Sequence, residues 1–212
     1  MAQGVSIEEW IWPAMGMTEA DPALTEELLV GIRRALPSAS PLLAADLLYA
    51  AANLSPPEAA PTFYAAGAAA LTAGLTGDLA LDRGHTTFLA TLHERAGDVD
   101  AGLAVLAEAA AAYPDEFTFH YAAAGLLLRA ERLDAALESV GLAVEHGYGD
   151  NRLRATKRKA DILSAQGKTA DAIRTIDAAL AAVEAPDAAL NVRTPRYLSA
   201  LQALREELTA EE

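Results

Sequence analysis

The chain has 212 residues, of which 52% are hydrophobic but only 6% aromatic, and it has no cysteine, which excludes disulfides, thiolate catalysis and zinc–thiolate sites. Its net charge is −14, with a balance of −8 over residues 1–82, −7 over residues 83–150 and +1 over residues 151–212. Because such a surface repels polyanions over most of its area, we expect neither nucleic acid nor an anionic membrane as a partner.

Residues 1–20 are predicted to form an irregular lead segment. They contain no basic region followed by a long apolar run, so we expect no signal peptide and a cytoplasmic protein. The pattern Ser6–Glu9 is a capping box, which predicts a short helix ending at Pro13. Trp10 and Trp12 either cover one end of a helical stack or form a docking segment for another protein or a second copy of the chain.

Residues 21–83 are predicted to be an N-terminal helical region packed on the repeats that follow. Three serine- or aspartate-proline pairs, Asp21-Pro22, Ser40-Pro41 and Ser55-Pro56, mark helix starts. The segment Asp78–Gly84 is predicted to be a linker or a single turn. The sequence is rich in alanine and shows no alternating strand pattern, so the fold class is predicted to be all-α.

Residues 84–186 contain three copies of one residue pattern, separated by steps of 34 and 36 residues. Small and aliphatic residues recur in five aligned columns: Ala90, Ala124 and Ala160; Gly102, Ala136 and Ala172; Leu103, Leu137 and Ile173; Leu106, Val140 and Ile176; Ala109, Ala143 and Ala179. A period of this length is typical of stacked helical hairpins. The predicted units are 84–116, 117–150 and 151–186.

The turn within each predicted hairpin falls at Gly97, Glu131 and Gly167. Glycine at the end of a helix relieves the strain of a left-handed backbone. Residues 187–212 are predicted to hold a C-terminal capping helix, which starts at Pro195, and a short tail. The leucine stripe of this helix would close the exposed edge of the stack.

These columns resemble the tetratricopeptide repeat (TPR) family, in which a large residue and a small one sit midway along the first helix, as in Leu89-Ala90. The resemblance covers 84–186 and implies a right-handed α-solenoid of about three repeats whose concave face binds peptides. The family's early aromatic residue is replaced by Thr86, His120 and Thr156, and Lys159 stands in place of a leucine.

Carrying the groove columns of the family over to this chain gives a predicted peptide-binding groove. Its residues are Thr87, Thr91, Glu94 and Arg95 from the first repeat, Tyr121, Gly125, Leu128 and Arg129 from the second, and Arg154, Lys157, Arg158 and Asp161 from the third. Arg154 and Arg158 lie four residues apart, so they share a helix face and can hold one carboxylate between them. The alternative is a solvated face whose cations pair with the acidic second repeat.

No nucleophile motif or phosphate-binding loop occurs in the sequence, and Asp78, Asp82 and His85 make only a weak metal pattern. We therefore predict no enzyme activity, no cofactor and no metal. The predicted function is a protein–protein interaction scaffold that binds a protein segment, such as an acidic peptide. The alternatives are a small acidic TPR chaperone of the bacterial kind, for a secreted or assembled partner, and a structural subunit that self-associates through its N-terminal segment.

Overall fold

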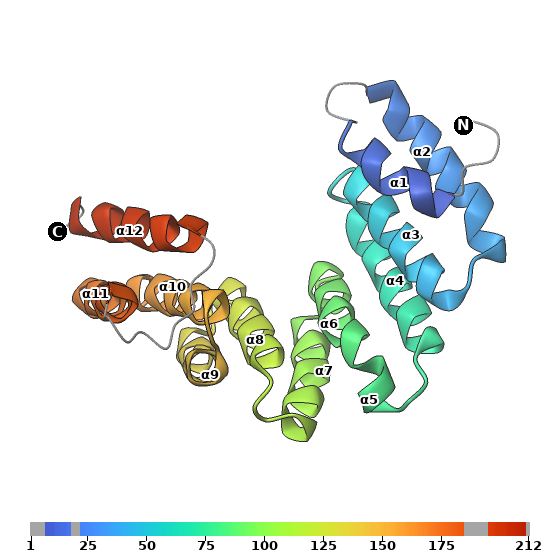
Figure 1. The fold of residues 1–212 in the computed structure, drawn as a ribbon. Helices are drawn as coiled ribbons and strands as arrows, with labels where there is room; N and C mark the ends of the chain where they lie inside the picture. Colours follow the sequence, from blue (N-terminus) through green and yellow to red (C-terminus); the bar gives the residue numbers. More distant parts are fainter. Residues whose placement is uncertain (1–6, 18–21, 185–194, 211–212) are drawn as a thin grey trace. The chain divides into compact units, whose positions relative to one another are not determined.

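The computed structural model describes residues 7–17, 22–184 and 195–210, and this part of the chain is helical and contains no β-strand (Figure 1). Two 3₁₀ helices, η1 (Leu36–Ser38) and η2 (Arg83–His85), join longer elements. The α-helices are α1 (Ile7–Met15), α2 (Pro22–Ala35), α3 (Pro41–Leu54), α4 (Ala60–Gly74), α5 (Leu79–Asp82), α6 (Thr86–Arg95), α7 (Val99–Ala112), α8 (Phe117–Arg129), α9 (Leu133–His146), α10 (Asp150–Ala165), α11 (Thr169–Glu184) and α12 (Pro195–Ala210).

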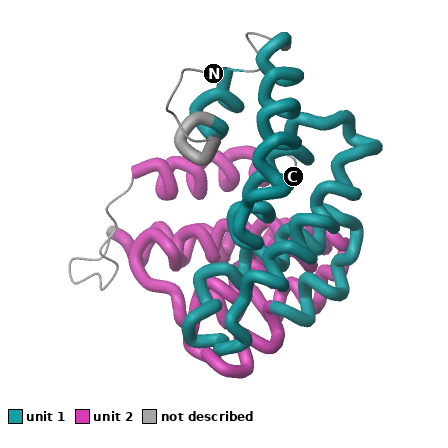
Figure 2. The backbone as a smooth tube through the Cα atoms, turned by 90° about the vertical axis from the view of Figure 1, so that its right-hand side faces the viewer, with its two compact units in different colours: residues 1–105 teal, residues 106–212 magenta. Residues whose placement is uncertain are grey.

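The chain divides into two compact units, residues 1–105 and 106–212, with the division inside α7 (Figure 2). In the first unit α1 packs on α2 and α3 on α4, and in the second unit α8 packs on α9 and α10 on α11. The described part of the chain is thus all-α, as predicted, and its consecutive helices pair as hairpins. The right-handed solenoid remains a prediction, as do the domain boundaries.

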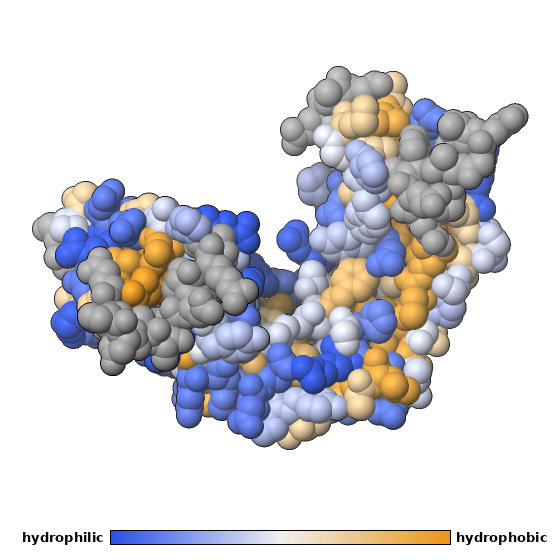
Figure 3. All heavy atoms as spheres, viewed as in Figure 1, coloured by the Kyte–Doolittle hydropathy of each residue, from blue (hydrophilic) through white to orange (hydrophobic). Residues whose placement is uncertain are grey.

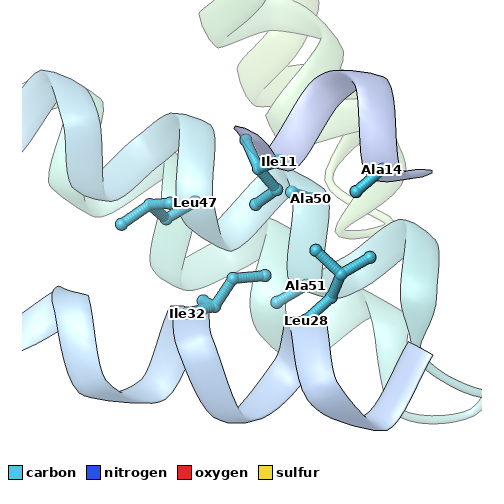
Figure 4. Packing of buried hydrophobic residues seen from close by; sticks show 7 residues of the cluster. All are labelled: Ile11, Ala14, Leu28, Ile32, Leu47, Ala50 and Ala51. Atoms are coloured by element: carbon cyan, nitrogen blue, oxygen red, sulfur yellow. The ribbon is translucent and has the colours of Figure 1, made fainter. Parts of the chain in front are cut away.

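The first unit is built on a core to which three helices contribute. Ile11 and Ala14 of α1 meet residues of α2 and α3, and all seven core residues are at most 3% exposed (Figure 4). The prediction that α1 ends at Pro13 is wrong, because the helix continues to Met15. Burial of Ala14 stabilises this last turn, in which Pro13 lacks only one amide donor.

The start predicted for α4 also differs from the observed one. The Ser55 hydroxyl donates to the Ala51 carbonyl oxygen at 2.7 Å, so this side chain closes α3 instead of capping α4. A turn follows, in which the Ala59 amide donates to the Pro56 carbonyl at 2.9 Å, and α4 begins at Ala60.

Polar and apolar side chains are intermixed on the face drawn in Figure 3, where an apolar stretch lies over α3 and α4.

An aromatic group joins four helices of the first unit around Tyr49. Its ring centroid lies 6.4 Å from that of Trp12, 5.7 Å from that of Tyr64 and 5.5 Å from that of Phe88. The Tyr64 hydroxyl donates to Asn53 Oδ1 at 2.8 Å, and burial raises the pKa of Tyr64. These four aromatic residues thus gather where α1, α3, α4 and α6 meet.

Four of the five repeat columns have matching burial in the structure, and in the fifth Ala179 is half-buried where Ala109 and Ala143 are buried. Ala90, Ala124 and Ala160, one from the first helix of each hairpin, are at most 1% exposed. The same holds in the second helices for a set of aliphatic residues: Leu106, Val140 and Ile176. Small side chains at such positions let neighbouring helices approach closely, and the aliphatic ones fill the space beside them.

The turn inside each of the three hairpins has the same backbone. Gly97, Glu131 and Gly167 have φ angles of 93°, 57° and 73°. In all three turns this residue's amide donates to the carbonyl three residues earlier, and the next amide donates to the carbonyl five residues earlier. This is the Schellman motif, so the predicted left-handed turn is confirmed, with one non-glycine residue held in it.

We expect Glu131→Gly to raise the free energy of unfolding by about 0.5–1 kcal/mol. A left-handed backbone costs an ordinary residue about 1–2 kcal/mol, and the entropy of glycine in the unfolded chain offsets part of that gain. Urea denaturation measures the change. Glu138→Gly, at an exposed position inside α9, is the matched control and should instead lower stability by about 1 kcal/mol. Destabilisation by both variants would contradict the strain assigned to Glu131.

Candidate functional site

Helices α8 and α10 of the second unit bring several predicted groove residues together. The guanidinium carbon of Arg158 lies 3.7 Å from the centroid of the Tyr121 ring, and that of Arg154 lies 4.9 Å from the same centroid. Both distances fall within the range of cation–π interactions. With Gly125 and Arg129 of α8, described below, these residues form what we call the arginine–tyrosine cluster.

Arg158 is fixed in place by the backbone of α8. Its Nη1 donates to the Tyr121 carbonyl oxygen at 2.6 Å, and the side chain is half-buried. Burial lowers the pKa of Arg158 most, and the positive charges of Arg129 and Arg154 lower it further, while Tyr121 and Asp161 oppose the shift. An arginine nevertheless keeps its proton in a protein, so the cluster holds a partly desolvated positive charge.

Gly125 provides the space in which this guanidinium lies. A Cβ atom at Gly125 would be 2.8 Å from Nη1 of Arg158 and 3.4 Å from Nη1 of Arg129. The ends of two arginine side chains therefore approach the same point on α8. Any residue larger than glycine at this buried position must displace Arg158.

Arg154 lies between two tyrosine rings. Its guanidinium carbon is 5.8 Å from the ring centroid of Tyr197 on α12, in addition to its contact with Tyr121, and its Nη1 donates to Asn151 Oδ1 at 3.2 Å. Arg196 lies over the Tyr197 ring at 4.7 Å. Arginine and tyrosine side chains thus alternate from α12 across α10 to α8.

Sequence reasoning missed two aromatic residues of this site. Phe117 stacks on Tyr121 with ring centroids 5.1 Å apart and an interplanar angle of 20°. Its position four residues before Tyr121 on one helix face is a signal that could have revealed it. Tyr197 had no such signal, because its contact with Arg154 depends on how α12 packs against α10.

Two other predicted groove residues on α10 neutralise each other. Lys157 Nζ lies 3.0 Å from Asp161 Oδ1, one helical turn further on. Arg154 and Arg158 bond instead to a neutral amide and to a backbone carbonyl. The alternative of a solvated face whose cations pair with the acidic second repeat stays a prediction.

Of the remaining groove residues, Leu128 and Arg129 lie at the end of α8, half-buried and exposed respectively. The first-repeat residues lie on α6 in the other unit, where the Thr91 hydroxyl donates to the Thr87 carbonyl at 2.8 Å. Glu94 and Arg95 occupy the last turn of that helix. The role of this group in binding stays a prediction.

The predicted docking segment lies in α1, which includes Trp10 and Trp12. The Trp12 side chain is 47% exposed. Beside it is a pocket of about 290 Å³ between α1 and α3, with Ile11, Leu43 and Leu47 in its wall. The ring of Trp12 therefore packs partly inside its own unit and partly faces solvent.

The weak metal pattern of Asp78, Asp82 and His85, at the start of the first repeat, includes two aspartates with structural roles. Asp82 accepts hydrogen bonds from the Thr76 amide at 3.0 Å, the Thr76 hydroxyl at 3.1 Å and the Gly77 amide at 2.8 Å. Asp78 caps α5 by accepting from the Ala80 amide at 2.9 Å. Within the described ranges no three histidine, aspartate or glutamate side chains are grouped in a way that suits a metal ion.

We expect the hydrogen bonds to the Asp82 carboxylate to make the free energy of unfolding fall at acid pH. The Thr76 amide, followed by the Thr76 hydroxyl and the Gly77 amide, lowers the pKa of Asp82, although burial opposes them. A carboxyl group with a lowered folded-state pKa stabilises the fold above its unfolded value, about 3.9, and this contribution is lost as pH falls through the folded value. Asp82→Asn should therefore lower the melting temperature at pH 7. Below pH 4 the melting temperature of the variant should fall less steeply than that of the native chain. Equal acid profiles for both proteins would contradict this.

Comparison of the chain with protein-family models and with curated proteins gives no match. No helix in the described part of the chain has the length and apolar character needed to cross a lipid bilayer.

Proposed function

We propose that this chain is a non-catalytic, TPR-like interaction module that binds an anionic protein segment at the arginine–tyrosine cluster. The observation that carries the proposal is the placement of Arg158, which lies over the Tyr121 ring at 3.7 Å with Arg129 and Arg154 as charged neighbours. The matched burial of four of the repeat columns and the three identical turns support the TPR-like assignment. In that family the first helices of the hairpins, here α8 and α10, line the peptide groove.

The placement favours binding because it brings like charges together before any ligand arrives. Neighbouring guanidinium groups repel one another, and a bound anion removes that repulsion. Arg158 is already held by a hydrogen bond and a ring contact, so binding orders little further side-chain freedom. A guanidinium also presents several N–H donors in one plane, which suits the two oxygens of a carboxylate.

The test is isothermal titration of the full chain with a short peptide that carries glutamate and aspartate side chains. The double variant Arg154→Ala with Arg158→Ala should lose affinity by at least tenfold, about 1.4 kcal/mol. Arg174→Ala is the control, because Arg174 is an exposed arginine of the same unit that pairs with Asp171 on its own helix. Equal loss in the control, or none in the double variant, would refute the site.

A second candidate function, self-association, is favoured by the exposure of Trp12 and of Met17, which are 47% and 61% exposed. Deleting residues 1–20 is a poor test, because Ile11 and Ala14 belong to the core. Trp12→Ala is better, since it removes the exposed ring and leaves those residues in place. Light scattering should then show a smaller mass than that of the native chain if this surface joins two copies. The same mass for both proteins would dismiss it.

A further inference from the structure

The cluster offers more N–H donors than a single carboxylate accepts. Each arginine carries five N–H groups, and Arg154 and Arg158 each use Nη1 for a protein oxygen. A carboxylate has two oxygens and one negative charge. A phosphomonoester has three terminal oxygens and a charge of about −1.5 to −2 at pH 7, so it engages more of these donors.

The charges around Arg158 favour a dianion as well. Arg154 and Arg158 bring two positive charges, and their hydrogen bonds go to neutral oxygens, while the neighbouring carboxylate is that of Asp161. That carboxylate is already 3.0 Å from Lys157 Nζ. A monoanion therefore leaves positive charge uncompensated in a half-buried place, whereas a dianion compensates more of it.

We infer that the anionic group bound at the arginine–tyrosine cluster is the phosphomonoester of a phosphorylated peptide. This inference rests on the proposed function, because it specifies the ligand of the same site. Arg154 and Arg158 reach the phosphoryl oxygens from α10, and Arg129 reaches them from α8. Because these arginines come from two helices, their N–H donors approach the bound group from more than one side. A tetrahedral phosphoryl group has oxygens on several sides to accept from them, whereas a planar carboxylate has two oxygens in one plane.

A nucleic acid also carries phosphate, but the cluster suits it less well. Single strands bind by stacking their bases on aromatic rings. Phe117 already stacks on the Tyr121 ring, and the guanidinium groups of Arg154 and Arg158 lie over it. Tyr197 has Arg154 and Arg196 over its ring. The rings of the site are therefore already in use by the protein, and the net charge of −14 opposes a polyanion.

The test compares three peptides of one neutral sequence, blocked at both ends, that differ only in a central serine, phosphoserine or glutamate. Titration of the full chain at physiological salt should give the phosphoserine peptide at least tenfold higher affinity than the glutamate peptide, and inorganic phosphate should compete. Arg158→Lys keeps the charge but loses the planar donors, so it should reduce this preference more than Arg174→Ala does.

The outcomes separate this inference from the proposed function. Equal affinity for the phosphoserine and glutamate peptides would overturn the inference and leave anionic-peptide binding standing. No binding of either peptide, with the protein folded by circular dichroism, would overturn both. Tighter binding of a single-stranded oligonucleotide than of the phosphoserine peptide would overturn the inference in favour of a nucleic-acid ligand.

Discussion

Replacing Gly125 with alanine should weaken anionic-peptide binding by at least tenfold while the protein stays as stable as the native chain or becomes more so. The new Cβ atom would lie 2.8 Å from Nη1 of Arg158, closer than a Cβ atom approaches a non-bonded atom, and 3.1 Å from its Cζ, a tight contact. Arg158 is the end of a long side chain, so it can swing away at low cost. It then loses its hydrogen bond to the Tyr121 carbonyl and its place over the ring.

The stability of the same variant should move in the opposite direction. Alanine inside a helix is better than glycine by about 0.8–1 kcal/mol, and α8 gains this on substitution. Gly141→Ala on α9 is the matched control, because no described atom from outside the adjoining backbone of its own helix lies within 4 Å of the added Cβ. Both variants should gain stability in urea denaturation, but only Gly125→Ala should lose affinity. Unchanged affinity in Gly125→Ala would show that the position of the Arg158 guanidinium beside Gly125 does not matter for binding.

The largest loss of stability is expected from Phe119→Ala, about 3–5 kcal/mol. The Phe119 side chain is 1% exposed, and its ring centroid lies 6.4 Å from that of Tyr113. Truncation removes the ring from a packed interior and leaves a cavity that the surrounding helices cannot fully close. Since native domains are stable by only about 5–15 kcal/mol, a loss of this size lowers the melting temperature strongly.

A matched aromatic control lies in the same unit. Tyr148 is 79% exposed in the link between α9 and α10. Tyr148→Ala should change the free energy of unfolding by no more than about 0.5 kcal/mol, as surface substitutions usually do. Similar losses in the two variants, measured by urea denaturation, would contradict the placement of Phe119 in the core.

The hairpin positions could be predicted because they depend on local signals. The predicted turn positions Gly97, Glu131 and Gly167 separate α6 from α7, α8 from α9 and α10 from α11. Turn residues and recurring small residues act over a few positions along the chain, so they can be recognised without knowledge of the packing. The same reasoning placed Glu131 in the left-handed turn, where its φ is 57°.

Other features depend on packing that no local pattern reveals. Thr86, His120 and Thr156, which the resemblance aligns with an aromatic position of the TPR pattern, are buried and polar here. His120 Nε2 lies 2.6 Å from the Pro114 carbonyl oxygen, and the Thr156 hydroxyl donates to the Arg152 carbonyl at 2.9 Å. Nearby backbone therefore satisfies two of these polar groups, which makes their burial tolerable.

The candidate site divides in the same way. Arg154 and Arg158 were predicted as a pair from their spacing of four residues, because helix geometry alone places them on one face. Their contacts with Tyr121 and Tyr197 require α8 and α12 to pack beside α10, which is tertiary information. The sequence accordingly predicted the charges of the site and Tyr121, but not the other two aromatic residues, Phe117 and Tyr197.

The most direct test of the arginine–tyrosine cluster as a binding site is nuclear magnetic resonance of the arginine side chains during titration with the acidic peptide. The Nε–Hε signals of Arg154 and Arg158 should shift together and saturate at the affinity found by calorimetry, whereas that of Arg174 should stay in place. Saturable binding that leaves the Arg154 and Arg158 signals unmoved would contradict the assignment of function to this cluster.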